Sequence, residues 1–167
     1  MRTRLAILAL LSTACSGGDE AARGAGCAAY AADPDSPRAV CVSDPWVRPA
    51  AQGATATAAY FTVSATLAEF EVRGARADGF EAVELHRSLT EGGMMRMEPV
   101  SAVVVPADGS VSFEPGGFHV MLIGPDAALA EGDAVEITLD MSLGGPLTFT
   151  APVRRGGPDG GGGHAGH

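Results

Sequence analysis

Residues 40–153 form a series of short apolar stretches separated by turn residues, and this pattern restricts the fold more than any other feature. Val135, Ile137 and Leu139 alternate with polar residues, and a period of two places alternate side chains on opposite faces of a β-strand. The pattern therefore predicts many short strands. We expect them near residues 40–48, 57–65, 69–76, 80–88, 94–99, 102–105, 109–114, 118–123, 134–140 and 146–153.

Glycine-containing turns such as Asp78-Gly79, Gly92-Gly93 and Gly144-Gly145 separate these stretches. Only residues 126–132 could hold a turn of helix. Short strands with regular turn signals and no amphipathic helix predict an antiparallel β-sandwich or barrel. At 167 residues in all, a single domain spanning residues 40–153 is expected.

Residues 1–15 have the character of an export signal. Two arginines precede a short apolar run that is too short to span a bilayer, and small residues lead to Cys15. This order resembles a bacterial lipobox, with its leucine one position too far upstream, so we predict lipidation of Cys15. Ordinary signal cleavage after Ala14 is the alternative. Either route places the mature protein outside the cytoplasm, in the periplasm or on the outer face of a bacterial membrane, with a lipid anchor as the only membrane attachment.

Residues 16–39 are rich in Gly, Ala, Pro, Asp and Ser and are predicted to be a linker. If Cys15 is lipidated, Cys27 and Cys41 remain as an even pair in an exported protein, and we expect them to form a disulfide. Neither cysteine lies near a histidine or in a Cys-x-x-Cys pair, so metal ligation by these thiols is the weaker interpretation.

The formal net charge of −9 argues against a nucleic-acid partner, because such proteins carry a basic surface. No pairing of a nucleophile with a base is apparent, and we predict that the protein is not an enzyme.

Two of the four histidines and four of the six methionines lie between His86 and Met121. On a strand over residues 118–123, His119 and Met121 share one face about 7 Å apart, while Phe118, Val120 and Leu122 face the core. A His-x-Met pair of this kind presents two metal ligands side by side. The preceding Gly116-Gly117 pair allows a tight turn and leaves the site uncrowded.

A hairpin over residues 83–99 would bring His86 close to Met97, which gives a set of two imidazoles and two thioethers. Thioether and imidazole ligands favour Cu(I) over zinc, magnesium or calcium. We therefore predict a Cu(I) site at His86, Met97, His119 and Met121. Met94 and Met95 are assigned to packing or to the rim of the site, with one of them as an alternative ligand.

The order His86, ten residues, Met97, twenty-one residues, His119-x-Met121 resembles the motif of the PCu(A)C family of periplasmic copper chaperones. The resemblance covers about residues 44–153. The sequence around the ligands also resembles that of the family. The resembling segments are Asp44-Pro45-Trp46-Val47-Arg48, Ala58-Ala59-Tyr60-Phe61-Thr62-Val63, Val83-Glu84-Leu85-His86 and Pro115-Gly116-Gly117-Phe118-His119-Val120-Met121.

The resemblance implies a cupredoxin-like Greek-key β-barrel or sandwich that binds one Cu(I) at an exposed site. It also implies delivery of copper toward the dinuclear copper centre of cytochrome c oxidase, with an oxidase subunit or a Sco-type protein as partner. Two features depart from the family. Arg87 and Ser88 stand where relatives often have a methionine, and the segment between Thr66 and Glu69 is short, which bears on partner recognition more than on metal binding.

Residues 154–167 form a glycine-rich tail that ends in His164-Ala165-Gly166-His167. Two imidazoles on a flexible tether could bind a second copper as Cu(II), which favours nitrogen ligands. A tail whose histidines have no specific role is the alternative.

Copper chaperone is thus the function that the sequence favours. The alternatives are a lipid-anchored protein for copper buffering or tolerance and a metal-independent β-sandwich binding module. An electron-transfer cupredoxin needs a cysteine thiolate with two histidines, and neither Cys27 nor Cys41 lies in a loop with a histidine.

Overall fold

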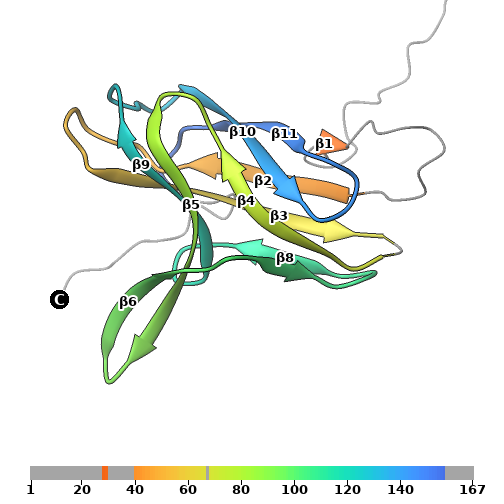
Figure 1. Cartoon of the computed structure of the whole chain (residues 1–167). Coiled ribbons are helices and arrows are strands. Elements are labelled where there is room, and N and C mark those ends of the chain that lie inside the picture. The colour runs from red at the N-terminus through yellow and green to blue at the C-terminus, as the bar shows by residue number, and fades with distance from the viewer. Residues whose placement is uncertain (1–27, 30–39, 67, 157–167) are drawn as a thin grey trace, which may run out of the picture.

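A computed structural model of the chain describes residues 28–29, 40–66 and 68–156, and shows two packed β-sheets (Figure 1). Seven strands form the larger sheet, in the order β1-β2-β3-β8-β9-β5-β6. They are β1 (Ala28–Ala29), β2 (Val40–Val47), β3 (Ala56–Ala65), β8 (Ser110–Phe113), β9 (Phe118–Pro125), β5 (Phe80–Glu91) and β6 (Met94–Pro99). The smaller sheet has the order β11-β10-β4-β7 and consists of β11 (Leu147–Pro152), β10 (Ala134–Met141), β4 (Phe70–Arg76) and β7 (Val103–Val105).

The core lies between the two sheets and is built from alternate residues of their strands. Val135, Ile137 and Leu139 are buried on β10, as their spacing predicts. Phe61 of β3 stacks on Phe113 of β8 and meets Phe149 of β11 edge-on, at ring-centroid distances of 4.5 and 5.0 Å. Each fully buried side chain of this size contributes roughly 1.5–3 kcal/mol to folding, so the alternating apolar residues are the main source of stability.

The predicted all-β sandwich is confirmed, and each predicted strand has a counterpart in the structure within a few residues. β1 was not predicted, because two alanines carry no strand pattern. β5 runs beyond the predicted residue 88 to Glu91, since its pairing with β6 continues to Glu91 and Met94. Residues 126–132, the segment that could hold a turn of helix, contain none: Leu129 instead forms a two-way backbone bridge to Ala50.

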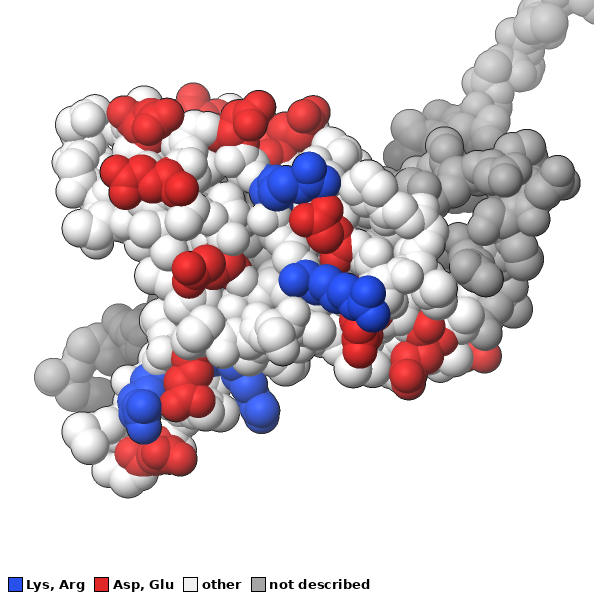
Figure 2. Space-filling view, viewed as in Figure 1, with Lys and Arg blue, Asp and Glu red and all other residues white. Residues whose placement is uncertain are grey.

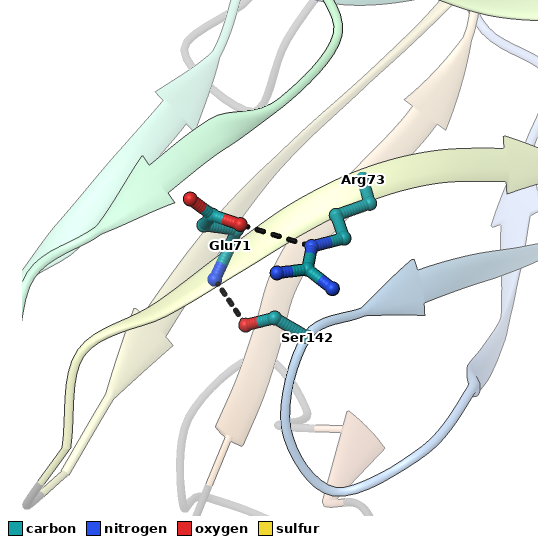
Figure 3. A network of polar contacts seen from close by, with 3 residues as sticks. All are labelled: Glu71, Arg73 and Ser142. Atoms are coloured by element: carbon teal, nitrogen blue, oxygen red, sulfur yellow. Dashed lines mark hydrogen bonds and ion pairs between the residues drawn. The ribbon is translucent and has the colours of Figure 1, made fainter.

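A polar network joins β4 to the end of β10 (Figure 3). The backbone N–H of Glu71 donates to Ser142 Oγ at 2.9 Å, and the backbone N–H of Ser142 donates to the Glu71 carbonyl at 2.8 Å. Arg73 Nε donates to the Glu71 carboxylate at 2.9 Å. The β10–β4 register shifts between Asp140 and Met141, and these bonds hold the chain where the regular ladder is interrupted.

β1 pairs antiparallel with β2, which places Ala29 opposite Cys41. Cys41 is disulfide-bonded. The predicted partner, Cys27, precedes β1 directly and lies outside the described residues, as do Cys15, His164 and His167.

Figure 2 shows acidic side chains distributed over one face of the domain, with a few separate basic side chains between them. Within the described ranges, no helix is long and apolar enough to cross a membrane.

Candidate metal centre

The predicted ligands lie on the outer face of the larger sheet, on three adjacent strands. β9 is hydrogen-bonded to β5, and β5 is in turn bonded to β6. The β5–β9 register places His86 directly opposite His119 and Glu84 directly opposite Met121. Residues in direct register share a face of a sheet, so both histidines and Met121 lie on one surface.

The alternation predicted for β9 is present. Val120 and Leu122 are fully buried in the core between the sheets, and His119 and Met121 face the other way and line a pocket of about 320 Å³. His119 is nonetheless only 4% exposed, because its ring lies 5.8 Å from the His86 ring and 6.4 Å from the Tyr60 ring, centroid to centroid. The two imidazoles therefore form a sheltered pair.

Met97 reaches the same surface from β6, as the hairpin prediction requires. It pairs with Ser88, the next residue after His86 on the same face of β5. Met97 is 56% exposed and lines the pocket with His119 and Met121. All four predicted ligands thus lie on one face of the sheet, with the imidazoles buried and Met97 largely exposed. His119, Met97 and Met121 line the pocket, whereas His86 is not among its lining residues and lies beside His119. Figure 1 shows the β5–β6 hairpin, which carries Met97, extending beyond the rest of the domain.

The other two methionines of β6 differ from one another. Met95 lies two residues from Met97 on the same face and also lines the pocket, whereas Met94 is not among the lining residues. Their exposed fractions are 63% and 71%, which excludes packing, the first of the two roles expected for them. The structure agrees with the alternative for Met95, a place on the rim.

Replacing Met95 with leucine should speed the release of Cu(I) to a competing chelator several-fold if its thioether stabilises the departing ion, and should leave the melting temperature unchanged because the side chain is exposed. Stopped-flow mixing of the loaded protein with a chromophoric Cu(I) chelator measures this rate. Met94→Leu is the matched control, because it removes a neighbouring thioether outside the pocket. Equal release rates in the two variants would show that Met95 has no contact with the ion.

A small aromatic cluster supports the floor of the pocket. Trp46 and Tyr60 pack with ring centroids 4.4 Å apart, and Arg48 Nη2 donates to the Tyr60 hydroxyl at 3.0 Å. Ala58 stands directly opposite Met121 and leaves room for its longer side chain. Gly116 has φ 86°, a conformation that favours glycine, and a side chain there would meet nothing within 4 Å. The predicted uncrowded turn is therefore present.

Each histidine uses one ring nitrogen for a hydrogen bond within the protein. His119 Nδ1 lies 3.2 Å from the Gly117 carbonyl, and His86 Nε2 lies 2.8 Å from Glu84 Oε2. The Gly117 carbonyl also accepts the Ser88 backbone N–H at 3.0 Å, which ties β5 to the turn before β9. His86 Nδ1 is buried without a hydrogen-bond partner. A histidine that binds a metal commonly makes a hydrogen bond through one ring nitrogen and binds the metal through the other.

Burial lowers the pKa of His119 below its usual 6.5, against the opposing effect of its hydrogen bond to Gly117; the nearby His86 and Arg48 lower it further. A lowered pKa keeps the imidazole neutral near pH 7, which is the form that binds a metal.

The lowered pKa predicts a loss of stability in acid. The unfolded chain takes up a proton on His119 near pH 6.5, and the folded protein does so only at lower pH, so the free energy of unfolding falls as pH drops through that window. Urea denaturation of the metal-free protein across this range measures the fall. His119→Gln cannot titrate and should show a shallower fall; equal slopes for both proteins would contradict the assignment.

The donor set fits a soft metal. Among the residues that the structure describes, no three His, Cys, Asp or Glu side chains converge as a metal site. Two imidazoles alone do not complete a coordination sphere, and the other soft donors on the same face are the thioethers of Met97 and Met121. Sequence reasoning missed Glu84, Ser88 and Tyr60 as parts of the site. The signal for Glu84 was its place two residues before His86, which puts both on one face of a strand.

Two of the solved structures that resemble this fold contain copper. The copper-bound PCuAC domain from PmoF2 matches with a TM-score of 0.60 at 24% identity and covers 77% of this chain and 98% of that domain, which shows the fold. The Cu(I) solution structure of DR1885 from Deinococcus radiodurans matches with a TM-score of 0.55 at 28% identity and covers 75% of this chain and 81% of that one. A two-sheet sandwich with histidines and methionines on one outer face is thus a PCuAC-type domain, and the resemblance noted in the sequence is confirmed.

Sequence comparison places the chain more narrowly. The family described as "Putative lipoprotein LpqE-like" matches residues 40–153. "Putative lipoprotein Lxx21020" of Leifsonia xyli subsp. xyli (strain CTCB07) is 34% identical over 117 residues, which are 69% of each chain. The chain belongs to the LpqE-like family. Its solved relatives are copper-binding domains and not enzymes, in agreement with the expectation of a non-enzyme.

Proposed function

We propose that this protein is an extracytoplasmic copper chaperone that binds one Cu(I) through His86, Met97, His119 and Met121. The observation that carries the proposal is the pairing of two sheltered imidazoles, with ring centroids 5.8 Å apart, next to a pocket that His119 lines together with the thioethers of Met97 and Met121. The copper-bound state of related domains supports copper as the cargo. Cu(I) is the oxidation state that a site with two thioethers favours.

The contrast in exposure suits transfer of the ion. His86 and His119 are 8% and 4% exposed, while Met97 is 56% exposed. A copper ion held between them is reached from solvent on the thioether side, so an incoming ligand can bind before the imidazoles release the ion. A carrier needs this order of events, because the ion then stays bound throughout the transfer and no free copper is formed.

The family resemblance also implies a destination for the copper. We propose delivery toward the dinuclear copper centre of cytochrome c oxidase, to an oxidase subunit or through a Sco-type protein. The names of the relatives as lipoproteins support export and a lipid anchor at Cys15. The tail histidines His164 and His167 are proposed to bind a second copper as Cu(II). Copper buffering or tolerance is the competing role for the same site.

Anaerobic competition with a chromophoric Cu(I) chelator, followed by mixing with the copper-accepting domain of an oxidase subunit, tests this function. We expect one Cu(I) bound per domain and transfer to the acceptor faster than the chelator removes it. Binding without transfer would favour buffering. A melting temperature that does not respond to Cu(I) would favour a metal-independent binding module, because a ligand of the native state stabilises it.

A further inference from the structure

Glu84 lies beside His86 and is not one of the four predicted ligands. Both residues are on β5, two apart and on one face, and the Glu84 carboxylate contacts His86 Nε2 at 2.8 Å. The His86 side chain is 11% exposed and that of Glu84 is 48% exposed, so the carboxylate covers the solvent side of a buried ring. The other ring nitrogen, Nδ1, is buried and has no partner.

The acceptors determine which nitrogen of each ring carries the proton. An ionised carboxylate only accepts hydrogen bonds, so His86 Nε2 is the donor and the neutral ring keeps its lone pair on Nδ1. A carbonyl oxygen also only accepts, so His119 Nδ1 donates to Gly117 and its lone pair is on Nε2. The two facing rings therefore present opposite nitrogens.

We propose that Glu84 is a positioning residue that fixes the Nε2–H tautomer and the orientation of His86, so that copper is bound by Nδ1 of His86 and Nε2 of His119. This inference rests on the proposed copper site and adds to it the nitrogen that each ring uses. Copper would then bind His86 Nδ1, which is one of two buried side-chain nitrogens without a hydrogen-bond partner among the described residues; a buried polar atom is unfavourable while it has no partner.

Glu84 acts through the histidine and does not bind the metal in this assignment. Within the described residues, Glu84, His86 and His119 do not converge as a three-residue metal site. A soft Cu(I) ion also prefers sulfur and nitrogen to carboxylate oxygen. The basic side chains nearby have other contacts: Arg87 lies over the Phe118 ring and Arg48 is bonded to Tyr60, which leaves the Glu84 carboxylate to His86.

Three variants separate positioning from charge. Glu84→Ala removes the acceptor, and Glu84→Gln keeps an acceptor oxygen without the charge. Glu98→Ala is the matched control, because it removes a carboxylate from the neighbouring strand β6 whose ion pair is with Arg96, at 3.2 Å, and not with a histidine. The melting temperatures of the metal-free variants check that all three are folded.

Long-range proton–nitrogen NMR of the metal-free protein reads the tautomers directly, without copper. We expect Nε2–H at His86 and Nδ1–H at His119 in the parent and in Glu84→Gln, and a mixture of His86 tautomers in Glu84→Ala. A parent His86 with its proton on Nδ1 would overturn the proposal whether or not the protein binds copper. Failure of the parent to bind Cu(I), with the expected tautomers, would instead overturn the proposed function.

Cu(I) is diamagnetic, so the same spectra identify the nitrogens that bind it. We expect the resonances of His86 Nδ1 and His119 Nε2 to shift on loading, and Cu(I) affinity to fall by about 10–100-fold in Glu84→Ala, the usual cost of losing such a partner. The fall should be smaller in Glu84→Gln and absent in Glu98→Ala. Equal affinities in Glu84→Ala and Glu98→Ala, or binding through His86 Nε2, would overturn the assignment.

Discussion

Replacing both His86 and His119 with alanine lowers the affinity for Cu(I) by more than about 100-fold. Loss of an outer partner of a ligand typically costs 10–100-fold, and this change removes two ligands outright. The two neighbouring imidazoles are the nitrogen donors of the proposed ligand set, and the remaining thioethers cannot replace them. Anaerobic competition against a chromophoric Cu(I) chelator measures the affinity.

The chain offers a matched control for this change in the tail. Replacing His164 and His167 with alanine also removes two imidazoles, and the pocket should keep its Cu(I) affinity. A second readout is Cu(II) binding, which we expect the tail variant alone to lose. If instead the tail variant loses Cu(I) and the pocket variant retains it, the site has been placed on the wrong histidines.

The strands and the faces of the site were predictable because a strand has an exact period of two. That period put Val120 and Leu122 in the core and His119 and Met121 on the opposite face, and the structure agrees. The hairpin between residues 83 and 99 followed from the Gly92-Gly93 turn, since both glycines have the positive φ that such a turn requires.

The register between distant strands was not predictable in the same way. β5 and β9 are separated by three other strands along the chain, and alternation alone leaves their relative shift undetermined. The direct opposition of His86 and His119 is a result of tertiary packing. The hydrogen bond from His86 to Glu84 depends on side-chain rotamers, and sequence spacing does not determine these.

The face of the sheet on which the aromatic residues below the pocket lie was also not predictable from the sequence. Trp46 and Tyr60 alternate with apolar residues on their strands, so the pattern fits either face of the sheet. The structure places them outside the main core, in a separate cluster with Ala58. The Tyr60 hydroxyl accepts a hydrogen bond from Arg48, and burial raises its pKa, with the nearby Arg48 cation opposing that rise. A polar partner on this face is what lets an aromatic residue lie beside an exposed pocket.

Replacing Phe61 with alanine lowers the free energy of unfolding by about 3–5 kcal/mol, the usual cost of truncating a buried phenylalanine. Phe61 is 2% exposed, and it contacts Phe113 within its own sheet and Phe149 from the opposite sheet, so its loss opens a cavity between the two layers. Urea denaturation of the metal-free protein measures the change. Val104→Ala is the control on the surface: Val104 is 50% exposed, and its truncation should cost less than about 0.5 kcal/mol.

Copper binding should offset the stability that the Phe61→Ala change removes from the core. Cu(I) at about 1,000 times its dissociation constant stabilises a native state that alone binds it by about 4 kcal/mol, which is close to the cost of the Phe61→Ala change. Loading should therefore restore most of the lost stability of Phe61→Ala, because the site lies on the outer face of the sheet and does not contact the cavity. The same variant with His86 and His119 also replaced should gain nothing. Recovery in the absence of both histidines would mean that copper acts elsewhere on the chain, and no recovery with both present would mean that the native fold does not bind it.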